Sequence, residues 1–126
     1  MSFNNNLYTT FRVVFFMSMN GNEVLVKAVL KAADFLEVSQ DDLVTVLGVD
    51  LRLSCNSEID PISESGQRAL ILIRIFKSLH ALNGNDIRLI QHFMKNFNKG
   101  TGGIPAEQIK DSEGLIAVLT FLEILK

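Results

Sequence analysis

The chain has 126 residues, enough for one domain or for two small subdomains that share a core. Hydrophobic residues make up 48% of it, so a sizeable core is available, and its formal net charge of −2 argues against a nucleic-acid binder driven by bulk positive charge. A single cysteine, Cys55, excludes an intramolecular disulfide and a thiolate metal cluster, and favours a reducing, cytoplasmic location.

Residues 1–20 form a Phe-rich N-terminal extension that holds four of the nine phenylalanines. The β-branched and aromatic residues from Tyr8 to Phe16 favour an extended strand. Such a strand would pair with its counterpart in a dimer or pack against the body of the chain. The run "VVFFM" is far shorter than the ~20 apolar residues that span a bilayer. Because a basic region and a cleavage site are also missing, we expect neither a signal peptide nor an anchor.

Residues 21–60 have the outline of a helix-turn-helix. Apolar residues recur at near-helical spacing from Glu23 to Val38, which predicts an amphipathic helix. A second short helix is expected to begin with Ser39 as its cap and to end at Gly48. A third segment begins near Asp50 and ends before the first proline. Three short helices with a glycine-containing turn fit a helix-turn-helix.

Residues 61–126 are predicted to be a second helical region. A strongly apolar helix is expected over Gln67–Leu82, ended by the following Asn-Gly pair. A second helix over 86–97 would be capped by Asn85 or Asp86. Its predicted apolar face comprises Ile87, Leu89, Ile90, Phe93, Met94 and Phe97.

The C-terminal part continues with a glycine-rich loop, a short helix and a final helix. Pro105 is expected at the first turn of the short helix, and Asp111 or Ser112 would cap the helix over 113–126. Like Gln67–Leu82, this last helix is apolar on most sides, which fits either a central place in the core or burial at a homodimer or toxin interface. The predicted architecture is therefore all-α, with one strand in the N-terminal extension.

Three stretches together resemble the Xre/MbcA/ParS-type antitoxins. "KAVLKAADFLEVSQDDLVTVLGV" is similar to the first half of an Xre-type helix-turn-helix. "GQRALILIRIFKSLHALNGND" and "NKGTGGIPAEQIKDSEGLIAVLTFLEIL" resemble the toxin-binding domain of the family. The most specific piece is the order Asn98, Gly102-Gly103, Pro105, Ile109 and Glu113-Gly114-Leu115. The resemblance covers about Leu25 to Leu125 and divides the chain into a helix-turn-helix over 21–60 and a toxin-binding domain over 61–126.

The resemblance implies a protein without catalysis of its own. Members of the family bind and neutralise a partner toxin, commonly a RES-domain enzyme that consumes NAD; they also dimerise, and their helix-turn-helix represses the operon. We therefore expect a cognate toxin as partner, a homodimer, and occlusion of the toxin's active-site entrance. The toxin-binding surface would be formed or supported by Gly102, Gly103, Pro105, Ile109, Glu113, Leu115, Leu119 and Leu122.

The expected DNA-reading helix departs from the family pattern. Ser54 stands where an apolar anchor is usual, and Cys55-Asn56 replaces a Ser-Arg pair. The remaining candidates for phosphate or base contacts are Gln40, Arg52 and Asn56. Residues 21–60 contain eight acids and only three bases, the wrong sign for contact with a phosphate backbone. We expect DNA binding to be weakened or lost. The alternative function is a DNA-binding regulator of its own operon, and a third is an interaction module whose partner is no toxin.

Other chemical interpretations fit the sequence less well. "GTGG" lacks the Lys and Ser/Thr that follow the last glycine of a P-loop, so Gly102 and Gly103 are expected instead to adopt positive φ in a tight turn. His80 and His92 lie on different predicted helices without an acid four residues away, which argues against a metal site. We expect no cofactor and no metal.

A lesser departure from the family pattern lies before the glycine-rich loop, where Phe93 and Phe97 replace the Trp and Pro that are frequent in the family.

Overall fold

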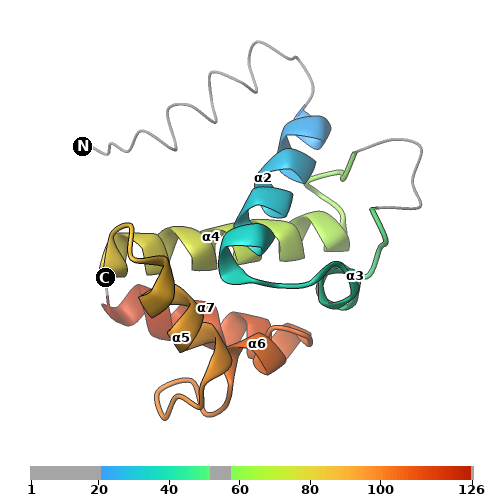
Figure 1. Ribbon diagram of the computed structural model, residues 1–126. Helices are drawn as coiled ribbons and strands as arrows, with labels where there is room; N and C mark the ends of the chain where they lie inside the picture. Colours follow the sequence, from blue (N-terminus) through green and yellow to red (C-terminus); the bar gives the residue numbers. More distant parts are fainter. Residues whose placement is uncertain (1–20, 52–57, 126) are drawn as a thin grey trace.

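The structure, a computed structural model, describes residues 21–51 and 58–125 (Figure 1). In these two ranges the chain forms helices and no strand, so the predicted all-α class is confirmed. The helices are α2 (Gly21–Leu36), α3 (Gln40–Leu47), α4 (Glu64–Asn83), α5 (Ile87–Lys95), α6 (Pro105–Gln108) and α7 (Ser112–Leu125). The predicted N-terminal strand and most of the third helix-turn-helix segment lie outside the described residues.

Helix α4 occupies the centre of the fold. It contacts α2, α3, α5 and α7; α2 crosses it, and α7 lies along it (Figure 1). Helices α4 and α7 run in the same direction. Two contacts show this: Arg68 Nη2 donates to Ser112 Oγ (3.1 Å) near the start of both helices, and Arg74 Nη2 donates to Glu123 Oε2 (2.5 Å) further along both. Packing against four neighbours explains why α4 is apolar on nearly all sides.

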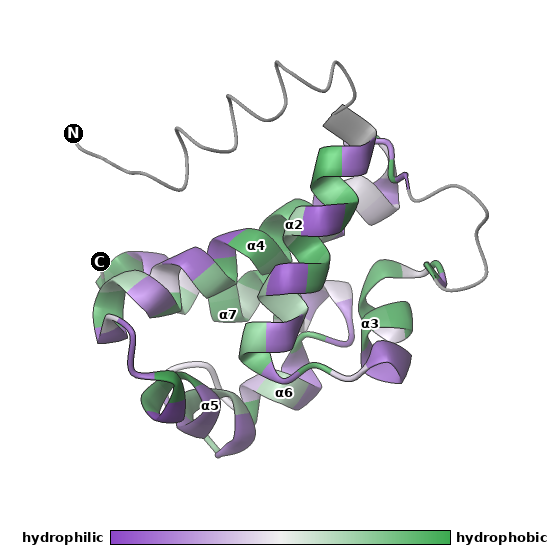
Figure 2. Cartoon of the chain, turned by 45° about the horizontal axis from the view of Figure 1, so that its top comes forward, coloured by the Kyte–Doolittle hydropathy of each residue, from purple (hydrophilic) through white to green (hydrophobic). Residues whose placement is uncertain are grey.

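One continuous core joins the two predicted regions. Leu25 of α2, Leu47 of α3, Leu72 of α4, Met94 of α5 and Leu122 of α7 are all buried in the same hydrophobic cluster. Figure 2 shows hydrophobic and hydrophilic residues alternating along α2, as expected for a helix with one buried face. The N-terminal helices and the C-terminal region therefore stabilise each other. No described helix is both long enough and apolar enough to cross a membrane.

Local capping interactions set most helix ends where they were predicted. Ser39 Oγ accepts a hydrogen bond from the Asp42 N–H (3.1 Å) and caps α3. Gly48, with φ 80°, ends α3 in the left-handed conformation that glycine adopts without strain. Gly84, with φ 63°, follows the last residue of α4.

Helix α2 spans Gly21–Leu36 and is thus shifted by two residues at each end from the predicted Glu23–Val38. Two helix ends in the C-terminal region also differ from the prediction. Helix α4 begins at Glu64 and not at Gln67, because Ser63 caps it and accepts from the Gly66 N–H (3.0 Å). Helix α5 ends at Lys95 and not at residue 97, because Asn96 adopts an extended backbone conformation. Both differences follow from single residues next to a strongly periodic stretch.

The other C-terminal caps agree with the prediction. Asp86 caps α5, its carboxylate accepting from the N–H groups of Arg88 and Leu89. Pro105 opens α6, and the Asp111 carboxylate accepts from the Gly114 N–H (2.7 Å) at the start of α7.

Ser78 places a buried hydroxyl group on the core-facing side of α4. It is 1% exposed, and its Oγ has no hydrogen-bond partner among the described residues. An unpaired buried hydroxyl costs about 1–3 kcal/mol. We therefore expect Ser78→Ala to raise the free energy of unfolding by about 1 kcal/mol, measured by urea denaturation. Ser78→Val, which removes the same hydroxyl but adds volume to a packed core, is the comparison; a loss of stability in Ser78→Ala would contradict the prediction.

Candidate functional site

An apolar groove opens between the C-terminal end of α4, helix α5 and the C-terminal half of α7. Its volume is about 350 Å³, within the range of ligand and peptide pockets. We call it the α4–α5–α7 groove. It is lined by Leu79, Leu82, Asn83, Leu89, His92, Phe93, Asn96, Phe97, Asn98, Phe121, Leu122 and Leu125.

The rim of this groove is made of large hydrophobic side chains that the fold leaves in water. Phe97 is 68% exposed, Leu89 and Leu125 are each 52% exposed, and Leu82 is 41% exposed. Scattered exposed apolar residues are ordinary on a protein surface, but a contiguous group around a depression marks an interaction site. The four residues come from α4, α5, α7 and the segment after α5, so only the tertiary fold brings them together.

The floor of the groove is aromatic and pre-organised. The rings of Phe93 and Phe121 are stacked, with centroids 6.4 Å apart and an interplanar angle of 5°. Leu79 and Leu122 are buried beneath them in the core. A partner would therefore meet an apolar floor whose two rings already pack against each other.

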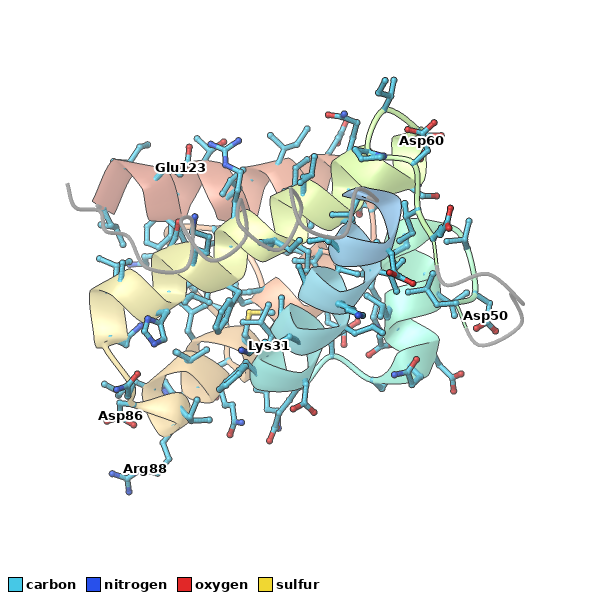
Figure 3. The ribbon with its side chains drawn as sticks, turned by 90° about the horizontal axis from the view of Figure 1, so that it is seen from above. Lys31, Asp50, Asp60, Asp86, Arg88 and Glu123 are labelled. Atoms are coloured by element: carbon cyan, nitrogen blue, oxygen red, sulfur yellow. The ribbon has the colours of Figure 1, made fainter. Side chains whose placement is uncertain are left out.

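The polar groups of the groove are amides and one imidazole. Asn83 Nδ2 donates to the Leu79 carbonyl oxygen (3.0 Å), and Asn96 Nδ2 donates to the His92 carbonyl oxygen (2.8 Å). No Lys, Arg, Asp or Glu is among the described lining residues. Figure 3 shows Arg88 of α5 extending away from the body of the protein. An apolar centre with neutral hydrogen-bonding groups resembles the core of a protein–protein interface, where charged residues are depleted.

The loop after α5 is held by Asn98. The Asn98 Oδ1 accepts from the Gly100 N–H (2.7 Å) and the Thr101 N–H (3.2 Å), and its carbonyl oxygen accepts from the Gly102 N–H (2.9 Å). An isolated bridge joins Asn98 to Gly103. These bonds fix the segment that supports one edge of the groove.

The two adjacent loop glycines have different roles. Gly102 has φ 84°, as predicted, but Gly103 is not among the positive-φ residues, so that prediction was wrong for Gly103. A Cβ at Gly103 would instead crowd the Gln108 side chain, 3.1 Å from its Cδ. At Gly100 a Cβ would overlap the ring of Phe121. A side chain at Gly100 would therefore require the Phe121 ring to move, whereas one at Gly103 would require only a shift of a few tenths of an ångström in the Gln108 side chain.

Most of the predicted toxin-binding residues lie inside the fold. Pro105, Ile109, Leu115, Leu119 and Leu122 are buried. These five can support a binding surface but do not form its outer layer. Of the eight predicted residues, only Gly102 and Glu113 are exposed and Gly103 is half-buried. Leu122 alone of the eight also lines the α4–α5–α7 groove.

Of the three residues predicted to contact DNA, the structure describes only Gln40. Gln40 is exposed in the first turn of α3, next to Asp41 and Asp42, whereas Arg52 and Asn56 lie outside the described residues. Figure 3 shows Asp50 and Asp60 at the same end of the molecule. The surface around α3 is therefore acidic, as the sequence predicted.

A cation from the C-terminal region partly balances this acidic surface. The Lys110 ammonium lies 3.1 Å from Glu107 Oε1 and 3.4 Å from Asp42 Oδ1. The pKa of Lys110 is raised above its ordinary value, mainly by the hydrogen bond to Glu107 and also by Asp42. Since a raised lysine pKa keeps the ammonium charged below that pKa, the link from this loop to α3 is retained at neutral pH and lost only as the pH rises through the pKa in alkali.

The described residues offer no group of three His, Cys, Asp or Glu side chains that could hold a metal ion. His80 and His92 are both exposed, and each contacts an asparagine, Asn85 and Asn96 respectively.

Comparison with known proteins finds no family model that matches this sequence and no matching curated protein. The α4–α5–α7 groove is therefore the feature from which a function can be argued.

Proposed function

We propose that this protein is an antitoxin that neutralises a partner toxin, of the RES-domain type, by direct binding through the α4–α5–α7 groove. The observation that carries the proposal is the uncharged, aromatic groove with four large hydrophobic side chains exposed at its rim. The resemblance of the C-terminal region to antitoxin toxin-binding domains supplies the class of partner. The mechanism is steric, because a bound antitoxin covers the entrance to the toxin's active site.

The exposed apolar surface is large enough to contribute substantially to binding. Complete burial of a Leu or Phe side chain is worth about 1.5–3 kcal/mol. Because the four rim residues are already about half buried, covering them fully would contribute roughly 1 kcal/mol each, or about 4 kcal/mol together. This amount corresponds to a factor of about 1,000 in affinity. The groove can therefore supply a binding hot spot, with further contacts around it.

The composition of the groove also supports a protein partner over other ligands. A nucleic acid requires Lys or Arg beside its phosphates, and the described lining residues include neither. The amides of Asn83, Asn96 and Asn98 suit the peptide groups of a protein segment. Homodimerisation remains a further proposal, for which the exposed Ile116 and Ile124 on the outer side of α7 offer apolar surface.

Co-expression with the neighbouring reading frame tests the proposed function. If that neighbour encodes a toxin, co-expression of this chain should restore growth, and the two proteins should co-purify in a fixed ratio through size-exclusion chromatography. Growth arrest that persists although both proteins are soluble and do not co-purify would refute the antitoxin proposal.

A further inference from the structure

The groove and the N-terminal extension are chemically complementary. The groove presents Phe93, Phe97 and Phe121 and no charged lining residue in the described part of the chain. Residues 1–20 contain four phenylalanines and a single charged residue, Arg12. An apolar segment of this kind gains free energy by covering an apolar groove.

The length of α2 limits which part of the extension can reach the groove of its own molecule. Helix α2 has 16 residues and is therefore about 24 Å long. Just after its C-terminal end, Glu37 forms an ion pair with Lys95 of α5, and the groove residues Asn96 and Phe97 follow Lys95 directly. Figure 1 shows α5 beyond the C-terminal end of α2, so the two lengths add, and the start of α2 lies roughly 25–35 Å from this edge of the groove.

An extended chain advances about 3.3 Å per residue. Phe16, five residues before Gly21, reaches about 17 Å, which is too short. Phe11, ten residues before Gly21, reaches about 33 Å, and Leu7 reaches about 46 Å. The distances therefore select the residues around Leu7 and Phe11 and exclude Phe15 and Phe16.

We propose that the segment from Leu7 to Phe11 docks in the α4–α5–α7 groove of the same molecule. The tether favours this intramolecular contact, since a short linker gives an effective concentration in the millimolar range. The segment shields the exposed rim around Phe97 while the chain is free, and a partner that uses the groove must displace it. The contact itself does not depend on the identity of any partner.

Disulfide trapping in the full-length chain tests this contact without a partner. In a Cys55→Ser background, Thr10→Cys is combined with Asn96→Cys, which places one thiol inside the docking segment and one at the groove. The matched control combines Ser18→Cys with Asn96→Cys, because residue 18 is only three residues from Gly21 and reaches about 10 Å. Under mild oxidation, followed on non-reducing gels, the first pair should form an intramolecular disulfide at least tenfold faster than the second.

A third variant separates docking from random collision. Adding Phe11→Asp to the Thr10→Cys and Asn96→Cys pair should slow cross-linking at least tenfold, because a carboxylate is unfavourable in an uncharged apolar groove. Circular dichroism confirms that each variant is folded. Cross-linking unaffected by Phe11→Asp, or found only as covalent dimers, would overturn the proposal. Because no partner is present, this result is independent of the test of antitoxin activity.

Discussion

On the proposed antitoxin function, replacing Phe97 by aspartate is expected to weaken binding of the partner toxin by roughly 100-fold and to abolish neutralisation in cells. Phe97 projects from the rim of the α4–α5–α7 groove and is 68% exposed. In the complex its ring would be buried, and losing that burial would cost roughly 1–2 kcal/mol. A charge at this position would add a desolvation cost. The measurement is the Kd of the purified pair by calorimetry, together with growth rescue.

The fold of the variant should be unaffected, because a largely exposed side chain contributes little to the core. The matched control is Ile62→Asp, which places the same charge on a residue that is 84% exposed and precedes α4, at the end of that helix opposite the groove. Binding should be unchanged in this control. If folded Phe97→Asp protein neutralised the toxin as well as the unmodified chain, the groove would not be the toxin-binding surface.

Replacing Gly114 by alanine is expected to destabilise the protein by about 3 kcal/mol or more. Helix propensity alone predicts the opposite sign, a gain of about 1 kcal/mol, because Gly114 lies within the first turn of α7. A Cβ at this position, however, would overlap the backbone carbonyl oxygen of Gln108. Backbone atoms cannot rotate away as a side chain can, so α7 or α6 would have to shift.

Urea denaturation of Gly114→Ala and its neighbour Glu113→Ala separates these two effects. Glu113 is exposed in the same helical turn, and its replacement should cost less than about 1 kcal/mol, mainly by removing a favourable charge near the helix N-terminus. Gly66→Ala provides an independent repeat, because a Cβ there would overlap the Asp60 carbonyl oxygen at the start of α4. Unchanged or increased stability in both glycine variants would show that the close approach is not required.

These glycines give a physical reason for part of the sequence pattern between Asn98 and Leu115. Gly114 allows α7 to start directly against the Gln108 backbone, and Gly103 packs on the side chain of the same glutamine. The loop, α6 and the start of α7 are thereby held as one unit. The order of Asn98, Gly103 and Gly114 in the sequence therefore has a structural basis, whatever partner the protein binds.

Helix existence and most helix ends were predictable from the sequence because their causes are local. Ser39, Asp86 and Asp111 each accept hydrogen bonds from N–H groups two or three residues ahead. Pro105 and Gly48 act through their own backbone preferences. The shifted ends of α4 and α5 were missed because the prediction followed the apolar periodicity and gave too little weight to the neighbouring polar residues Ser63 and Asn96.

The candidate site was much less predictable. Ile90, Met94, Leu89 and Phe97 were assigned to one apolar face of the same helix, yet the first two are buried and the last two are exposed around the groove. Conversely, Leu115 and Leu119 were expected to form or support a binding surface, and their burial in the core leaves them only the supporting role. The amino-acid sequence by itself determined the helices, their caps and the all-α class, because those depend on hydrogen bonds and periodicity within a few residues. Only the tertiary structure decided which apolar residues remain uncovered, because burial depends on which distant helices pack over them.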